Sequence, residues 1–296
     1  MKKILFVFLF LLFGFLLWYL FLKPYDYLIK FKAGTSPRFV YEGVENWTQT
    51  LDSALLSPTT DFRSFSQQIV MNDSTYTYNW KVNPINDSLS VVKVYIKDEN
   101  HSLANKIAIP FTKSAIEVIS KNRLSEFKKG LDAFLKTFRV KIEGQENNPG
   151  SFCACISSKS TTKDKAQVMV AGNDIIVPFL YNNGVEIKGK PLVKVTRWNQ
   201  DDKTIAFDFC FPVTKTDSLP VHEKITYKKI KARKSIKAIF NGNYRFSDRA
   251  WYAITDYAQQ KNIKLDNNPL EIFHNDPHNG GNAIQWKTEV FIPVKE

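Results

Sequence analysis

Two acidic residues occupy equivalent places in two strand-like segments of the C-terminal half. Asp208 lies four residues before Pro212, Glu289 lies four residues before Pro293, and a valine follows each proline. A carboxylate among apolar side chains is costly unless it is hydrogen-bonded or paired with a cation, so Glu289 is suited to attract a cationic ligand. For Asp208 a second interpretation stays open: its side chain faces solvent, because alternation fixes the face of a strand only in a known register.

Aromatic residues of the same C-terminal half are candidates for the walls of a binding site. Aromatic faces attract cations that come within about 6 Å of the ring centre. For Trp198 and Trp251, packing in the core is the more usual role of a large indole. The candidate ligand-binding residues are Glu289, Asp208, Tyr244, Trp286, Trp251, Phe273 and Trp198.

The sequence carries none of the common catalytic signatures. It has no nucleophile elbow, no metal-binding helix motif and no phosphate-binding loop. His274 and His278 have the spacing of a helical metal site, but Pro277 between them favours a turn. We therefore predict no catalytic residue, no metal and no cofactor, and an enzyme is the less favoured class.

The elements that position the candidate residues form an internal repeat. Pro191-Leu192 and Pro269-Leu270, which both lead into strands, are 78 residues apart, and Pro212 and Pro293 are 81 apart. A nearly constant offset with the same order of elements is what a repeat predicts. Two such copies would form one sheet with two helices across one face. Each copy is predicted to run strand, helix, strand, strand, over 151–157, 162–182, 191–198 and 204–212, and over 225–240, 247–261, 269–275 and 284–293.

The second copy resembles the gyrase-inhibitor-like effector-binding domain, which is also fused to AraC-type activators and multidrug-sensing regulators. The likeness is carried by Gly242-Asn243-Tyr244, the helix with Trp251, Pro269 to Phe273 and Trp286 to Val294. It extends over 139–296, with repeats at about 150–213 and 224–294. The resemblance implies a cleft between the copies that binds small, often aromatic or cationic molecules, with Glu289 as its acidic group.

The chain departs from those regulators because we find no DNA-binding helix-turn-helix in its sequence. We therefore predict a small-molecule-binding or sensor protein, with nucleic acid an unfavoured partner. Two alternatives stay open. The resemblance also implies a hydrolase of reactive small molecules, with Glu289 as base and Tyr244 as proton donor. The third possibility is a protein-interaction module at the membrane.

An apolar segment at the N-terminus predicts a membrane anchor over residues 1–23. Ile4 to Leu22 is a 19-residue run without a charge, which as a helix spans about 29 Å, close to the hydrocarbon thickness of a bilayer. A cleaved signal peptide is the alternative, but the run is long for one and no small-residue cleavage site follows. We expect a single-pass membrane protein whose soluble part is exported.

Residues 24–138 alternate between strand-like and helical patterns, so the whole chain is predicted to be α+β. We expect a strand from Tyr25, a helix over 36–52, four strands over 63–71, 75–82, 88–97 and 104–110, and a long helix over 116–138. This order resembles a START-like, or polyketide-cyclase-like, helix-grip domain: an antiparallel sheet around a long helix. The residues that carry the likeness are Tyr25 to Ile29 and Val44 to Trp47.

Charge and cysteine content add two expectations. The net charge is +12, and seven basic residues fall between Lys224 and Lys237; their alternation with apolar residues favours one solvated strand face over a lipid or nucleic-acid site. Three cysteines are too few for a disulfide framework. A bridge from Cys153 or Cys155 to Cys210 stays open.

Overall fold

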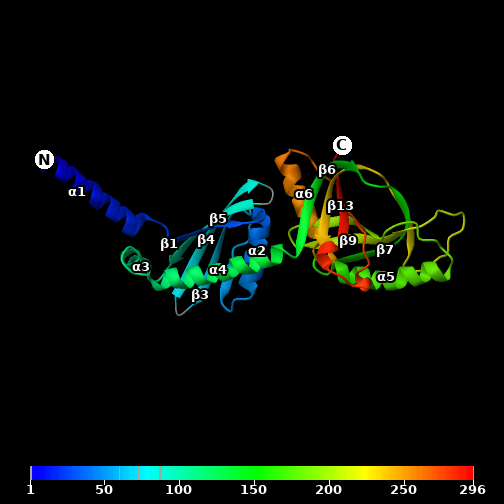
Figure 1. Cartoon of the computed structure of the whole chain (residues 1–296), viewed down its shortest axis with the longest axis horizontal. Coiled ribbons are helices and arrows are strands. Elements are labelled where there is room, and N and C mark those ends of the chain that lie inside the picture. The colour runs from blue at the N-terminus through cyan, green and yellow to red at the C-terminus, as the bar shows by residue number, and fades with distance from the viewer. Residues whose placement is uncertain (1, 60, 72–73, 87–88, 296) are drawn as a thin grey trace. The chain divides into compact units, whose positions relative to one another are not determined.

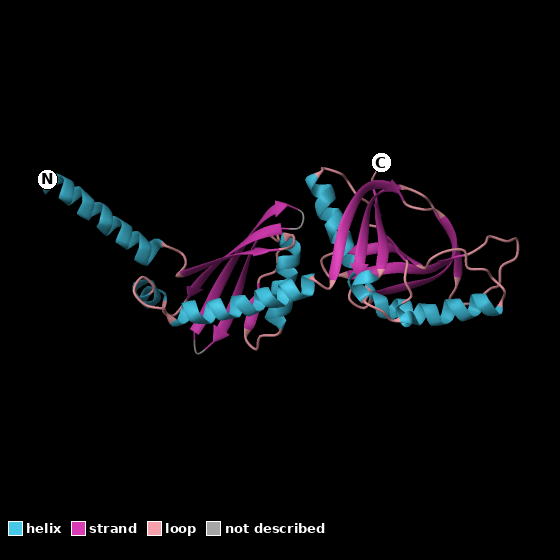
Figure 2. Cartoon of the chain, viewed as in Figure 1, coloured by secondary structure: helices cyan, strands magenta, loops and turns pink. Residues whose placement is uncertain are grey.

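The computed structural model describes residues 2–59, 61–71, 74–86 and 89–295. The chain divides between Leu135 and Lys136 into two compact units, each built on one antiparallel sheet with helices (Figures 1 and 2). The fold is therefore α+β, as predicted, and both of its sheets are antiparallel.

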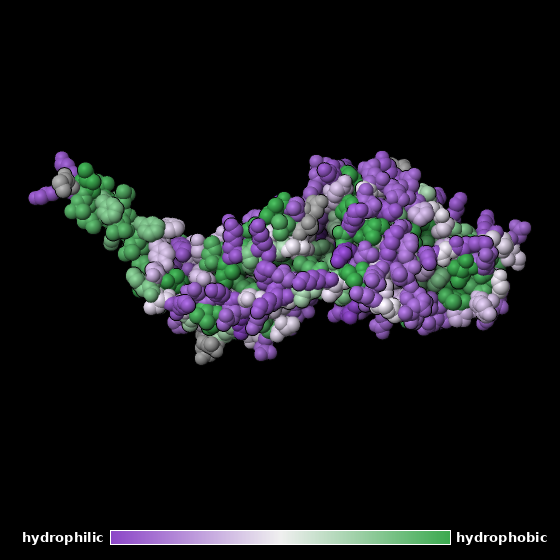
Figure 3. Space-filling model, in the orientation of Figure 1, coloured by the Kyte–Doolittle hydropathy of each residue, from purple (hydrophilic) through white to green (hydrophobic). Residues whose placement is uncertain are grey.

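The N-terminal segment is one apolar helix. Helix α1 (Lys2–Leu17) continues as a single π-helical turn, η1 (Trp18–Leu22), and none of its residues is buried. Apart from its N-terminal end, α1 has a hydrophobic surface (Figure 3). Among the described residues it is the one helix long and apolar enough to cross a membrane, and a signal sequence meets the same criteria.

The first unit holds five strands in the order β1-β5-β4-β3-β2. Helices α2 and α4 contact β1, β2 and β4. The bounds are β1 (Tyr27–Ala33), α2 (Pro37–Gln49), β2 (Ala54–Leu56), β3 (Ser64–Met71), β4 (Ser74–Asn86), β5 (Leu89–Asp98), α3 (Ser102–Ala108) and α4 (Ala115–Leu135).

Aromatic side chains fill the core of this unit. Tyr78 and Trp80 are fully buried, and the Trp80 ring contacts Phe65, Phe127 and Trp47, with ring centres 5.8, 5.4 and 6.4 Å away. These rings occupy the space between the sheet and the long helix α4. The likeness to a START domain stays a prediction.

The predicted strand over 104–110 is wrong, because α3 occupies Ser102–Ala108. The Asp98 carboxylate at the end of β5 accepts hydrogen bonds from the backbone N–H groups of Asn100 and His101, both at 3.0 Å. It also accepts one from the Asn105 side chain. These bonds close a turn directly before Ser102, the first residue of α3, and so they favour a helical turn where the apolar pattern alone suggests a strand.

The second unit holds eight strands in the order β10-β7-β9-β8-β12-β13-β11-β6. Helix α5 runs along β7 and β9, and α6 runs along β11, β6 and β13 (Figure 2). The bounds are β6 (Phe138–Asn147), β7 (Ser151–Thr161), α5 (Lys165–Asn182), β8 (Leu192–Asn199), β9 (Thr204–Pro212), β10 (Thr226–Ile230), β11 (Lys234–Gly242), η2 (Tyr244–Phe246), α6 (Asp248–Gln260), β12 (Leu270–Phe273), η3 (Pro277–Asn279), η4 (Ala283–Gln285) and β13 (Lys287–Pro293).

Both halves of this sheet run strand, helix, strand, strand, as β7-α5-β8-β9 and β11-α6-β12-β13, and they join where β8 pairs with β12. The strand before each half pairs with the other half: β6 with β11 and β10 with β7. The predicted single strand over 225–240 is therefore wrong. The Asn148 side chain interrupts it by donating to the Lys231 carbonyl and accepting from the Arg233 N–H. A duplication origin stays a prediction.

The register assigns the side chains of this sheet to two faces. Phe209, Val193, Glu271 and Val290 are successive partners across β9, β8, β12 and β13. They lie on the face covered by the helices, because a Cβ on Gly172 of α5 would lie 3.0 Å from the Phe209 ring. The neighbouring row of partners, Cys210, Leu192, Ile272 and Glu289, points to the opposite face, since successive side chains of a strand alternate.

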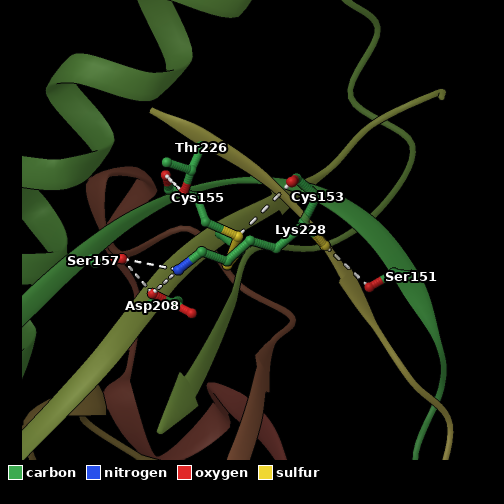
Figure 4. The surroundings of a disulfide bond; sticks show 8 residues. Ser151, Cys153, Cys155, Ser157, Asp208, Thr226 and Lys228 are labelled. Carbon is green, nitrogen blue, oxygen red and sulfur yellow. Dashed lines mark hydrogen bonds and ion pairs between the residues drawn. A yellow bond between two sulfur atoms is a disulfide. The ribbon is translucent and has the colours of Figure 1, made fainter. Parts of the chain in front are cut away.

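That opposite face carries the disulfide between Cys155 and Cys210, which are directly paired on β7 and β9 (Figure 4). Cys153 is buried and free, and its Sγ lies 3.1 Å from the Ser151 hydroxyl. Of the pairings left open by the sequence, the structure contains the one between Cys155 and Cys210.

Candidate functional site

A cavity of about 630 Å³ lies on the helix-covered face of the second unit. Its walls come from α5, from the ends of β9 and β12, from η2 and from the segment that follows β12. Most of the lining is apolar. The principal side chains are Met169, Phe209, Phe211, Tyr244, Phe273 and Trp286.

Tyr244 is held in the cavity wall by its neighbours. Its hydroxyl donates to the Asn275 carbonyl at 3.0 Å and accepts from the Asn275 N–H at 2.9 Å. Its ring centre lies 4.7 Å from that of Phe273 and 5.4 Å from that of Trp286. Burial raises the pKa of the Tyr244 hydroxyl, so the hydroxyl stays protonated at neutral pH and serves as a fixed structural group.

The chain can enter this wall only because residue 242 is glycine. Gly242 has φ of +152°, and a Cβ there would lie 2.8 Å from the Phe138 Cβ and 2.9 Å from the Phe240 ring. Asn243 then accepts a hydrogen bond from the Arg245 N–H and closes the η2 turn. The Gly-Asn-Tyr sequence therefore places Tyr244 by a combination of close packing and turn chemistry.

A buried ion pair lies beside the cavity. The Lys165 ammonium, on the first residue of α5, donates to the Glu271 carboxylate, and both side chains have zero exposure. Lys165 also donates to the Ser247 hydroxyl at 2.8 Å, and Glu271 accepts from the Trp251 indole N–H at 2.9 Å. Glu271 lies two residues before Phe273 on β12, on the same face. Every charge in this pair thus has a partner.

Asp248, at the start of α6, belongs to the same buried region. Burial raises the pKa of its carboxyl to about 7, although the Lys165 charge opposes the shift. Lys165 and Glu271 both interact electrostatically with Asp248. The first turns of α5 and α6 therefore meet β12 at one network of titratable groups.

Glu289 and Asp208 do not line this cavity. Glu289 is paired with Ile272 and so points to the face opposite Phe273. It accepts a hydrogen bond from Lys287 at 2.8 Å and lies 3.5 Å from the His274 ring. Although burial acts to raise the pKa of Glu289, the hydrogen bond from Lys287 and the charge of Lys237 hold it below its usual range.

Asp208 is buried on that opposite face, and the solvent-facing interpretation of it is wrong. Its carboxylate accepts from the Lys228 ammonium at 2.7 Å and from the Ser157 hydroxyl at 2.6 Å, next to the disulfide (Figure 4). Several residues of the basic stretch 224–237 make such ion pairs, including Arg233 with Asp266 and Lys237 with Glu146. This agrees with a paired and partly solvated strand face.

The two indoles predicted for the site pack in the core. Trp251 is fully buried, and its ring lies 5.3 Å from that of Trp198, edge to face. Trp198 makes a second contact of the same kind with Tyr252. Neither indole is among the cavity-lining residues. The structure thus brings Tyr244, Phe273 and Trp286 together, and places Glu289, Asp208, Trp198 and Trp251 elsewhere.

Sequence reasoning missed the contribution of α5 and the acid of β12. Met169, Val170 and Val177 line the cavity from α5, and Lys165 precedes them on the same helix. Glu271 was within the Pro-Leu-Glu-Ile-Phe segment that signalled the repeat. The usable signal was its position: an acid in a strand with Leu270, Ile272 and Phe273 around it has to meet a buried partner.

Comparison with known proteins agrees with a ligand-binding domain in this part of the chain. Residues 180–295 match the family described as the GyrI-like small molecule binding domain. No curated protein sequence matches the chain.

Three of the solved structures that are similar to part of this chain are as follows. The C-terminal domain of EcmrR is 18% identical, with a TM-score of 0.42 over 54% of this chain and 98% of that one. SAV2435 bound to tetraphenylphosphonium is 12% identical, with a TM-score of 0.35 over 52% of this chain and 94% of that one. A hydrolase from Listeria innocua is 12% identical, with a TM-score of 0.34 over 57% of this chain and 98% of that one.

Proposed function

We propose that this chain is a membrane-anchored protein that binds a small molecule in the cavity lined by Tyr244, Phe273 and Trp286. The observation that carries the proposal is the cavity itself. Its volume of about 630 Å³ falls within the roughly 300–1,000 Å³ of typical ligand sites, which are apolar with a few fixed polar groups. The family match over 180–295 supports the same function.

The lining suits a planar or bulky aromatic ligand. Phe209 and Phe211 from β9 lie at the sheet, Met169 comes from α5, and Tyr244 and Phe273 form a further wall. Aromatic walls and an adaptable methionine provide a large apolar contact area. A molecule with one or two rings fits the volume and the chemistry of these walls.

A hydrolase with Glu289 as base and Tyr244 as proton donor has less support. The hydroxyl of Tyr244 is engaged twice by Asn275, and Glu289 belongs to the opposite sheet face. A base and a donor that act on one substrate need to reach the same reacting atoms. Binding without turnover is therefore the function that the geometry favours.

The anchor belongs to the same proposal. The exposed apolar helix over Lys2–Leu22 has the length of a bilayer span, and it would hold the two units close to a membrane surface. In this arrangement the chain binds its ligand at the membrane. Among the described helices we assign none to DNA binding, and a small molecule is the proposed partner.

The test is a titration of the full chain in phosphatidylcholine nanodiscs with 2-naphthalenesulfonate and 2-naphthyltrimethylammonium, followed by tryptophan fluorescence. Empty nanodiscs give the blank. Saturable binding of at least one probe is expected, because Trp286 lines the cavity. A linear response equal to the blank for both probes contradicts the proposal.

A pair of variants on one helix localises the binding. Val170 of α5 is half exposed and lines the cavity, so Val170→Trp should fill the space and weaken binding at least ten-fold. Ala171, its exposed neighbour, is outside the lining, and Ala171→Trp should leave binding unchanged. Equal affinities for the two variants would show that the probe binds somewhere else.

A further inference from the structure

We propose that the cavity selects an organic anion with an aromatic body, and that it rejects the cation of the same shape. The inference rests on the proposed function, and it defines the charge class of the ligand. Its basis is the distribution of charge around the cavity: the buried acid beside it is paired with Lys165, and basic residues outnumber the single acidic residue of the lining.

The acid next to the cavity offers no attraction to a cation. Glu271 is bonded to the Lys165 ammonium and to the Trp251 N–H, and the Lys165 nitrogen also lies 4.6 Å from the centre of the Trp251 ring. A cationic ligand would have to compete with an ammonium group that is covalently part of the chain and completely buried. Within the described residues, the Glu271 carboxylate that could have paired with a cationic ligand is therefore already paired with Lys165.

The charged residues that line the cavity are mainly basic. Lys190 and Arg245 are exposed at its edge. The single lining acid, Asp276, accepts hydrogen bonds from the backbone N–H and the ring nitrogen of His278, at 3.0 and 2.9 Å. Leaving the histidines out of the count, two basic groups and one acidic group give a formal charge of +1 around the opening.

Two other titratable groups face this region. His274 lines the cavity, and its ring lies 3.5 Å from the Glu289 carboxylate on the far side of β12. Asp248 is buried beside Lys165 and Glu271, and its pKa is raised to about 7 by burial. At about pH 6 the Asp248 carboxyl is mostly neutral, so Lys190, Arg245 and Asp276 are the lysine, arginine and acidic groups that set the charge at the opening.

The physical consequence is that the opening of the cavity favours a negatively charged ligand group over a positively charged one. An anionic group at the opening can approach Arg245 and Lys190 while its rings occupy the apolar interior. Arginine and lysine form charge-assisted hydrogen bonds with carboxylates and sulfonates, and these are stronger than neutral bonds. A cationic head at the same place meets the net positive charge of these groups, and the one lining acid, Asp276, is already hydrogen-bonded to His278.

The test compares 2-naphthalenesulfonate with 2-naphthyltrimethylammonium, which share one ring system and differ in charge. The full chain in phosphatidylcholine nanodiscs is titrated with each at about pH 6 and low salt. We expect the sulfonate to bind at least ten-fold more tightly, with an affinity that falls as salt screens the edge charges. The inference is overturned if the ammonium probe binds as tightly as the sulfonate or more tightly. If Val170→Trp still abolishes that binding, the proposed function stands.

Variants assign the selectivity to named groups. Arg245→Gln and Lys190→Gln remove exposed charges and should each weaken sulfonate binding two- to five-fold without changing ammonium binding. Lys261→Gln, an exposed lysine outside the cavity lining, is the matched control. Unchanged sulfonate affinity in both edge variants contradicts the inference.

Lys165→Met leaves Glu271 without its cation and should shift the preference towards the ammonium probe by at least ten-fold. If this variant does not fold, the edge variants alone decide the inference. Failure of both probes to bind the wild-type chain counts against the proposed function, and against the inference with it.

Discussion

The ammonium group of Lys165 and the carboxylate of Glu271 form an ion pair in which neither side chain is exposed. The pair joins the first residue of α5 to the middle of β12, so it links a helix of one half of the sheet to a strand of the other half. The cavity lies next to this link. Its shape and its charge therefore depend on the same contact.

Removing only one partner of this ion pair should strongly destabilise the fold. Lys165→Ala leaves the Glu271 carboxylate buried without a counter-charge, which typically costs about 3–5 kcal/mol. Urea unfolding of the full chain, followed by circular dichroism, measures the loss. The double variant Lys165→Met with Glu271→Leu removes both charges and should recover most of the stability. A double variant that is less stable than Lys165→Ala contradicts this account.

The stability of the second unit should fall as the pH rises from about 4 to about 7. The folded-state pKa of Asp248 is about 7 and lies above the ordinary unfolded value, so the native state binds the extra proton in this window. The free energy by which Asp248 stabilises the fold is fully present below its unfolded-state pKa. It is lost as the pH rises through its folded-state pKa, by up to about 1.4 kcal/mol per pH unit. In Asp248→Asn the unfolding free energy should vary less over this range, and an unchanged slope argues against the assignment.

The disulfide should stabilise the second unit by about 2–4 kcal/mol, as expected for a bridge that closes a loop of this size. Cys155 and Cys210 are 55 residues apart. Cys155→Ala with Cys210→Ala should lower the unfolding free energy by that amount. Thiol titration of the unfolded, unreduced chain should count one reactive group, Cys153, and three after reduction. A count of three without reductant would rule out the bridge.

Two helical glycines should respond in opposite ways to alanine. In Gly172→Ala the new methyl group meets the Phe209 ring at 3.0 Å, so we expect destabilisation by about 1–3 kcal/mol and weaker ligand binding. Gly130 of α4 has open space at the same position, and Gly130→Ala should stabilise the chain by up to about 1 kcal/mol. Thermal unfolding of both variants gives the comparison.

The order of elements in the second unit was largely predictable from the sequence, because the spacing of apolar residues and the positions of turn residues are local properties. The helix over 162–182 and the strands over 191–198 and 204–212 lie within a few residues of α5, β8 and β9. The break between β10 and β11 was not predictable, because the side chain that causes it, Asn148, is more than 80 residues away in sequence. The start of α3 has a local cause instead. Asp98 lies four residues before Ser102 and accepts the His101 N–H, a contact that the alternation of apolar residues does not reveal.

Three aromatic residues of the candidate site were predictable from the sequence, but Phe209, Phe211 and the buried acid beside the cavity were not. Local sequence signals indicate where the three predicted residues lie. Tyr244 follows a glycine, Phe273 comes at the end of a strand, and Trp286 follows a turn. The choice of Glu289 over Glu271 needed the register between β12 and β13, which sets Glu289 beside Ile272 and away from Phe273. A shift of one residue exchanges the faces of a strand, and no pattern within β13 alone determines that register.

The N-terminal helix should remain part of the mature chain. Its length and its exposed apolar surface predict retention in the membrane fraction after carbonate washing. Intact mass measurement should find the residues of α1 still attached, and deletion of 2–22 should release the chain into the soluble fraction. A mature mass that lacks this segment would identify it as a signal sequence.

The most direct test of the central claim is a crystal structure of the chain with 2-naphthalenesulfonate. The account predicts the naphthalene rings between Met169 and Phe273, next to Tyr244 and Trp286, with the sulfonate towards Arg245. Rings bound anywhere outside this cavity, with the cavity closed by its own side chains, would contradict it.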